Sequence, residues 1–172
     1  MRNNRMGVGR RVAAGLGIVL MPLLSAAADV DAPPAERVKV ESVEVALSAV
    51  GPVVLLKALG KAVPVFVDQT VAESIHAALT KQPLPRPLSH DLMRAILASY
   101  GGKVTQVVVS LKGATYYGAL SVDLNGTAKV FDSRSSDAIA LAVHFSAPIL
   151  IGRDLLESAG QEITPPPGSQ RL

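Results

Sequence analysis

The stretch KVTQVVVSLKGATYYGALSVDLNGTAKVFDSRSSDAIALAVHFSAPILI, residues 103–151, decides the fold. Its first part is rich in β-branched and aromatic residues between short turn signals. It therefore predicts three consecutive strands, at 103–111, 114–123 and 127–131. The pair Asn125-Gly126 predicts a tight hairpin, since Asn-Gly is the strongest short signal for that turn.

The same stretch continues into a helix that is apolar on most of its sides, so we expect this helix to be buried. Ser135 or Ser136 is expected to cap its start, and the helix ends at His144 or Phe145. A short strand over 148–151 comes next. Beyond the stretch, a short helix over 154–158 completes the pattern.

Upstream, glycine and proline separate three apolar runs, which predict three successive antiparallel strands at 38–50, 53–59 and 63–67. Two amphipathic helices follow, at 69–81 and 89–100, on either side of a proline-rich loop. The order is therefore β-β-β-α-α-β-β-β-α-β-α. Because strands and helices are grouped, we expect an α+β fold with a mixed, mostly antiparallel sheet and helices packed on it.

Residues 1–28 have the three parts of a signal peptide: four arginines, an apolar run over 12–24, and small residues at 25–28. We expect cleavage after Ala28 and a periplasmic or secreted protein without a stable membrane anchor. An uncleaved anchor is the alternative. The pair Arg10-Arg11 leaves both the Sec and the twin-arginine export routes open. Composition then predicts a flexible lead-in over 29–37, a single domain over 38–163 and a disordered proline-rich tail over 164–172.

The net charge of +3 belongs to the precursor rather than to the domain. Residues 1–28 hold four arginines and no acidic residue, so residues 29–172 hold 13 basic and 14 acidic groups, a net charge of −1. Overall charge therefore gives no reason to expect a nucleic-acid partner. The chain has no cysteine, which excludes disulfides and zinc–thiolate sites.

Polar residues are densest in two short segments, each of which leads into a predicted helix. They read RPLSHDL over 86–92 and DSRSSDA over 132–138. A helix N-terminus exposes unpaired N–H groups and a partial positive charge, which suit an anion. The alternative is structural: the serines are N-caps, the aspartates complement the helix dipoles, and the arginines pair with aspartates. A histidine in a first helical turn, as at His90, is more often exposed than functional.

Glu73 and His76 form a third polar pair, three residues apart on one helix. This spacing holds a metal when several helices present such groups together, but the motif occurs once here, so we interpret it as an exposed polar face. There is no Gly-x-Ser-x-Gly nucleophile motif, no glycine-rich phosphate loop and no dinucleotide-binding fingerprint.

The two polar segments resemble motifs of the bifunctional nuclease domain family. The sequences VVVSL, between the two segments, and APILI, after them, resemble the same family. The resemblance covers about Val53 to Leu156. It implies a compact, usually oligomeric α+β domain, from a family whose members degrade DNA and RNA. The family's polar positions fall on a set of seven residues: Arg86, His90, Asp91, Asp132, Arg134, Ser136 and Asp137. Two positions depart from the family pattern, Val71 in place of a glutamate and Ser135 in place of a proline.

The first functional hypothesis is an exported, metal-assisted nuclease that hydrolyses phosphodiester bonds of DNA and RNA. The catalytic residues would be His90, Asp91, Asp132 and Asp137. Arg86, Arg134 and Ser136 would bind the substrate. Mg²⁺ or Mn²⁺ would bind Asp91, Asp132 and Asp137. This hypothesis requires the two polar segments to meet in space.

The second hypothesis is a non-catalytic, homo-oligomeric module that binds a ligand or a protein in the periplasm. The polar residues would then form a structural clasp, in which Arg86 and Arg134 pair with Asp91 and Asp132 across elements or across subunits. The near-neutral domain, the few aromatic residues and the missing glutamate favour this alternative.

Overall fold

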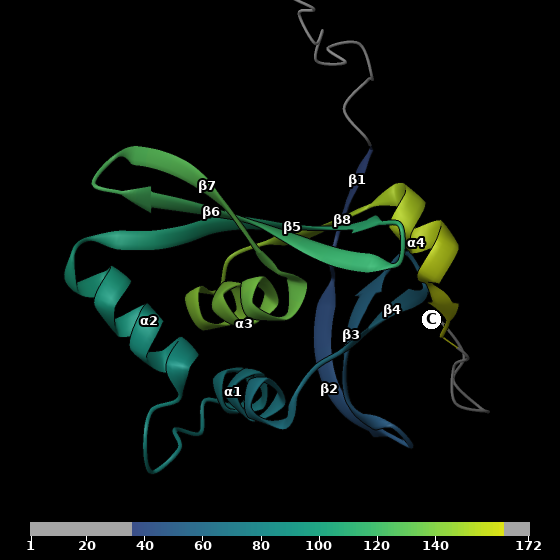
Figure 1. The fold of residues 1–172 in the computed structure, drawn as a ribbon, viewed down its shortest axis with the longest axis horizontal. Helices are drawn as coiled ribbons and strands as arrows, with labels where there is room; N and C mark the ends of the chain where they lie inside the picture. The colour runs from purple at the N-terminus through teal and green to yellow at the C-terminus, as the bar shows by residue number, and fades with distance from the viewer. Residues whose placement is uncertain (1–35, 164–172) are drawn as a thin grey trace, which may run out of the picture. The chain divides into compact units, whose positions relative to one another are not determined.

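A computed structural model describes residues 36–163, and the predictions for 1–28, most of the lead-in and the tail lie outside them. The α+β class and the predicted order of elements are confirmed (Figure 1). The helices are α1 (Gln69–Thr80), α2 (Ser89–Ser99), α3 (Ser135–Phe145) and α4 (Arg153–Ala159). The strands are β1 (Arg37–Lys39), β2 (Ser42–Ser48), β3 (Gly51–Ala58), β4 (Lys61–Phe66), β5 (Gly102–Lys112), β6 (Thr115–Leu124), β7 (Thr127–Arg134), β8 (Ile149–Gly152) and β9 (Gln161–Glu162). Within 36–163, no helix is both long enough and apolar enough to cross a membrane.

The strands form two sheets, where the sequence pattern suggested one. The five-stranded sheet has the order β1-β8-β5-β6-β7 and is mixed, because β8 runs parallel to β5. The four-stranded sheet has the order β2-β3-β4-β9 and is antiparallel. The predicted strand 38–50 is divided between them. The N–H of Val40 donates to Ile149 O at 2.9 Å and the N–H of Glu41 donates to Lys57 O at 2.8 Å, so consecutive residues bond to different sheets.

The hairpin predicted at Asn125-Gly126 is confirmed. Both residues have positive φ, 52° and 85°, as a tight turn between twisted strands requires. The turn sets the register in which β7 pairs with β6, from Leu124 opposite Thr127 to Tyr117 opposite Arg134. The same register places Arg134 at the end of β7, beside Tyr117 of β6 and directly before the first residue of α3.

Helix α3 is the centre of the core, as its apolar sequence predicted. It lies against the five-stranded sheet, with α1 and α2 packed beside it (Figure 1). Gly118 of β6 permits this close approach, since a Cβ there would lie 2.6 Å from Cβ of Ala138. Every residue from Ser135 to Ala142 except Asp137 is buried. The one partly open position of this run is thus an acidic side chain in the first helical turn.

Candidate functional site

The two polar segments meet where the first turn of α2 packs against α3. Nε2 of His90 lies 3.2 Å from Oδ1 of Asp137. Because a carboxylate only accepts, the imidazole donates through Nε2–H. Nδ1 of His90 is buried and has no hydrogen-bond partner among the described residues. His90 is only 4% exposed, so the expectation of an exposed first-turn histidine is wrong. The contact with Asp137 explains why a histidine is buried here.

Asp137 is also held by Arg134, which ends β7 and caps α3. Nε and Nη2 of Arg134 donate to the two carboxylate oxygens at 2.7 and 2.9 Å. This bidentate pair is the main reason why the pKa of Asp137 lies below its usual value, and the bond from His90 lowers it further. The pair also raises the pKa of Arg134. The guanidinium side chain is 67% exposed, so its outer face remains open to a ligand.

A second histidine, His144 in the last turn of α3, has a side chain that is only 5% exposed and continues the polar contacts. Its Nε2 lies 2.9 Å from Oγ of Ser74 in α1, and its Nδ1 lies 3.8 Å from Oδ1 of Asp91. The rings of His144 and His90 are stacked with centroids 6.4 Å apart. Burial is the main cause that lowers the pKa of His144. The polar contacts therefore run along one side of α3 from its first turn to its last.

A serine, a histidine and an aspartate contact one another here in the sequence found in a catalytic triad: Ser74, His144 and Asp91. The serine hydroxyl, however, is not accessible to a substrate. Ser74 is 1% exposed and lies between α1 and α3, where no substrate reaches its hydroxyl. A nucleophile must contact the atom that it attacks. This group therefore joins three helices and is not a nucleophilic centre.

Asp68 caps α1 and brings a further carboxylate to Arg134. Its Oδ1 accepts from the N–H of Val71 at 2.9 Å, and its Oδ2 lies 3.9 Å from Nη1 of Arg134. Sequence reasoning did not include Asp68, Ser74 or His144 in the site. A signal for His144 was present, since it follows Asp137 by seven residues and so lies on the same side of the helix.

The serine caps predicted for α2 and α3 are wrong. Leu88 is the N-cap of α2, and its backbone N–H donates to Oδ2 of Asp91 at 2.9 Å. Arg134 takes the cap position of α3 without a side-chain bond to the helix. Ser135 and Ser136 are buried in the first turn instead. Burial gives the hydroxyl of Ser136 little access to a substrate.

Two of the predicted site residues lie apart from the others. Arg86 is an exposed residue of the loop before α2, and Asp132 is an exposed residue of β7. Within the described part of the chain, neither forms a side-chain hydrogen bond or an ion pair. Within one copy of the chain these residues do not form the predicted clasp, since Arg134 binds Asp137 instead. Their pairing across subunits stays a prediction.

The described residues do not form the predicted three-carboxylate metal site. Over 36–163, no three histidine, aspartate or glutamate side chains are grouped so that they can hold one ion. Asp137 is bound to Arg134 at one end of α3, and Asp91 faces His144 at the other. The interpretation of Glu73 and His76 as an exposed face is confirmed, and Glu73 accepts a hydrogen bond from Gln69.

Comparison with known proteins identifies the family. The bifunctional nuclease domain matches residues 53–164. The chain belongs to the bifunctional nuclease domain family. It is also similar to two curated proteins of Mycobacterium tuberculosis, "Uncharacterized protein MT1877" of strain CDC 1551 / Oshkosh and "Uncharacterized protein Rv1829" of strain ATCC 25618 / H37Rv. Each is 36% identical over 114 residues, which span 63% of this chain and 66% of the relative.

In this bifunctional nuclease domain, the start of α3 presents an exposed guanidinium that is paired with Asp137. Arg134 is kept charged and oriented by Asp137, and the first turn of α3 begins beside it. Val71, where the family resemblance places a glutamate, is buried in the core. The carboxylate of Asp68 accepts a hydrogen bond from the backbone N–H of Val71 and also approaches Arg134.

Proposed function

We propose that this chain is an exported nuclease that binds the backbone phosphates of DNA or RNA at Arg134 and hydrolyses phosphodiester bonds there. The observation that carries the proposal is the bidentate bond between Arg134 and Asp137, which leaves the outer face of an oriented, permanently charged guanidinium open. Arginine in this arrangement is suited to a phosphate because its planar donors match two phosphate oxygens.

Each residue of the site then has a separate task. Arg134 binds the phosphate and stabilises the charge that develops on its oxygens as water attacks. Asp137 orients Arg134, and His90 orients Asp137 through Nε2, so both are positioning residues. Asp68 is about half exposed beside Nη1 of Arg134 and is placed to accept the proton of the attacking water. The P–O bond to the leaving group breaks as the new bond forms, and the departing oxygen takes a proton from solvent.

No step is assigned to a metal ion. Nucleases commonly use Mg²⁺ or Mn²⁺ on several carboxylates. The carboxylates of Asp91, Asp132 and Asp137 do not come together in this fold, so the residues present do not fit such a site. We therefore propose hydrolysis that persists in EDTA, contrary to the dependence on Mg²⁺ or Mn²⁺ expected from the sequence.

The test is hydrolysis of single- and double-stranded DNA and RNA by the purified protein in Mg²⁺, Mn²⁺ or EDTA. Arg134→Ala is expected to reduce the rate at least tenfold. Arg153→Ala is the matched control, because Arg153 is also a surface arginine paired with an acidic residue, Glu36, which directly precedes β1. Absence of cleavage under every condition, or equal rates for the two variants, contradicts the proposed activity. Cleavage abolished by EDTA contradicts the metal-free mechanism.

The second candidate is a non-catalytic homo-oligomer that binds a ligand or a protein. The burial of His90 and Ser74 and of the side chain of His144 favours it, since buried polar contacts of this kind join helices without offering reactive groups. This function predicts that His90→Ala lowers stability in a protein that cleaves no nucleic acid. A thermal melt beside the hydrolysis assay separates the two candidates.

Export is part of both proposals. Residues 1–28 would direct the chain out of the cytoplasm and be removed after Ala28. The mass of the protein recovered from the periplasm or the medium of an expressing bacterium tests this directly. A mature chain that begins at Asp29 is expected, and recovery of the intact precursor from the membrane supports an uncleaved anchor instead.

A further inference from the structure

An open apolar groove of about 750 Å³ lies between α2 and the β6–β7 hairpin. Met93, Ile96 and Leu97 form its wall on α2, and Leu120 and Phe131 lie on the face of the hairpin that is turned toward α2. Small-molecule sites usually measure about 300–1,000 Å³. The groove is therefore large enough to hold one small molecule.

The lining of the groove indicates the kind of molecule that fits it. Among the described residues that line it, Phe131 is the only aromatic one, and most of the others are Leu, Ile, Val or Met. Ile96 is 49% exposed and Phe131 is 42% exposed, so an apolar molecule seated between them would remove both from water. A nucleobase or another planar ring binds by stacking on aromatic side chains, and a single phenylalanine gives little surface for this. The lining therefore favours a flexible aliphatic chain.

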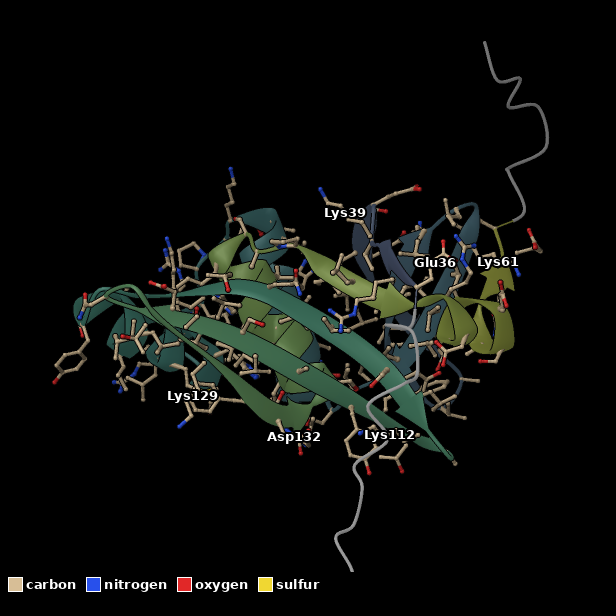
Figure 2. The ribbon with its side chains drawn as sticks, turned by 90° about the horizontal axis from the view of Figure 1, so that it is seen from above. Glu36, Lys39, Lys61, Lys112, Lys129 and Asp132 are labelled. Carbon is tan, nitrogen blue, oxygen red and sulfur yellow. The ribbon has the colours of Figure 1, made fainter. Side chains whose placement is uncertain are left out.

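Lys129 of β7 gives the groove one positive charge. It is the only charged residue among the described residues that line the groove, and its Nζ lies 5.1 Å from the centre of the Phe131 ring. Figure 2 shows Lys129 at one edge of the five-stranded sheet and Lys39 at the other. Because Lys129 is exposed on this outer strand, its ammonium group lies at the mouth of the groove rather than in its apolar part.

The ammonium group of Lys129 has no carboxylate partner within residues 36–163. Asp123 and Asp132, the acidic residues of β6 and β7, lie on the other face of the sheet. Neighbouring residues of a strand alternate between its faces, and Lys129 lies opposite Val122 on the groove face. The charge is therefore available to an anionic group of a bound molecule. A carboxylate carries one negative charge and matches one lysine, whereas a phosphate monoester carries nearly two at neutral pH.

We propose that the groove binds one free fatty-acid anion, with its aliphatic chain along Met93, Ile96 and Leu97 and its carboxylate at Lys129. The chain supplies most of the binding free energy by leaving water, and the ion pair determines which end of the molecule lies at the mouth. Arg134, Asp137 and the residues around them do not line the groove. The proposal therefore goes beyond the hydrolysis proposed above and does not depend on it, and failure of either test leaves the other unaffected.

The first test is isothermal titration of the purified protein with dodecanoate below its micelle concentration. One bound molecule per chain is expected. Lys129→Gln should raise the dissociation constant of dodecanoate about three- to fivefold, as for a partly exposed ion pair, and should leave that of the uncharged dodecan-1-ol near the wild-type value. Lys112→Gln is the matched control, because Nζ of Lys112 also lies over an aromatic ring, 5.2 Å from the centre of Tyr117, and Lys112 does not line the groove. Absence of dodecanoate binding, or equal weakening by the two substitutions, overturns the proposal.

The second test introduces a negative charge into the apolar wall. Ile96→Glu should weaken the binding of dodecanoate at least about tenfold, since the new carboxylate lies against the aliphatic chain. Leu47→Glu is the matched control, because Leu47 is 83% exposed and belongs to the other sheet. From octanoate to dodecanoate, each added CH₂ should lower the dissociation constant roughly fourfold until the groove is filled. A dissociation constant that is independent of chain length, or that Ile96→Glu leaves unchanged, contradicts the proposal.

Two other occupants of the groove would give different results. A second copy of the chain would appear in light scattering as a dimer that Ile96→Glu dissociates, and such a dimer overturns the proposal if it takes up no dodecanoate. A lipid surface would appear as binding to phosphatidylcholine vesicles that contain phosphatidylglycerol, and this result overturns the proposal if monomeric dodecanoate is not bound. Uptake of one dodecanoate per chain without binding to these vesicles supports a site for a free fatty acid.

Discussion

Nε2 of His90 lies 3.2 Å from Oδ1 of Asp137, although the two residues are 47 positions apart in the chain. This contact joins the first turns of α2 and α3. It also ties the buried imidazole to Arg134, which holds the same carboxylate. A substitution of Asp137 therefore both releases the surface side chain of Arg134 and removes the hydrogen-bond partner of the buried His90.

Asp137→Asn is expected to lower the free energy of unfolding by about 1 kcal/mol at neutral pH. It weakens three charge-assisted bonds, two from Arg134 and one from His90. Such bonds are worth ~1.5–3 kcal/mol each when buried but less at this partly exposed carboxylate. The measurement is urea unfolding as a function of pH. Because the folded-state pKa of Asp137 is lowered, its stabilisation is full above the unfolded value near 3.8. It is lost as pH falls through the lower folded value.

The wild-type protein should consequently lose more stability below about pH 4 than the variant does. Asp154→Asn serves as control, since it also changes an aspartate in the first turn of a helix. A variant whose stability falls as steeply in acid as that of the wild type would show that Asp137 is not responsible for this loss.

His144 predicts a second pH dependence, at higher pH. Its folded-state pKa is lowered, chiefly by burial, from an ordinary value of 6.5. The unfolded chain therefore binds a proton more readily, and stability should fall as pH drops below about 6.5 until the lowered folded value is passed. The melting temperature of the wild type should be lower at pH 5 than at pH 8.

The quantity to compare is the difference between the melting temperatures at pH 8 and at pH 5, rather than the melting temperature at either pH. His144→Gln is less stable at both, because the contact with Ser74 changes, but its difference should be smaller than that of the wild type. His76→Gln alters an exposed histidine of α1 and should keep the wild-type difference. Equal differences in all three proteins would exclude His144 as the origin.

The sequence predicted most elements, because hydrophobic period and turn chemistry are local properties. It did not predict two sheets, since consecutive residues Val40 and Glu41 bond to strands far apart in the chain. The site was predicted in part. The motifs identified Arg134, Asp137 and His90, but the sequence does not reveal that His90 is buried, because its burial depends on how α2 packs against α3. Asp68 was missed for a similar reason, since only the fold brings the start of α1 to Arg134.

Gly118→Ala is expected to destabilise the domain by about 1–3 kcal/mol, the usual cost of overpacking a core. The new Cβ would lie 2.6 Å from Cβ of Ala138 and 3.1 Å from the carbonyl oxygen of Arg134, so α3 must move away from the sheet. Thermal or urea unfolding measures the effect. Adding Ala138→Gly removes the closest of these contacts, so the double variant should be more stable than the sum of the two single effects predicts. Simple additivity would mean that the helix does not press on this position.

Asp68 is the residue whose two tasks are best separated by substitution. Its Oδ1 caps α1 through the N–H of Val71, and its carboxylate charge approaches Arg134. Asp68→Asn keeps an oxygen for the cap but removes the charge, and asparagine is as good an N-cap as aspartate. The melting temperature should therefore stay close to that of the wild type. If Asp68 accepts the proton of the attacking water, the hydrolysis rate falls by a factor of at least about 100.

Asp68→Ala removes the cap as well, so it should lose about 1 kcal/mol of stability in addition to activity. Gln69→Ala, at the next residue, changes a side chain whose one hydrogen bond among residues 36–163 is to Glu73, and it should leave both properties near the wild-type values. The rate of phosphodiester hydrolysis and the unfolding curve, measured on the same preparations, distinguish the two tasks. If Asp68→Asn hydrolyses nucleic acid as fast as the wild type, Asp68 is a helix cap alone, and the base that activates water must be another residue near Arg134.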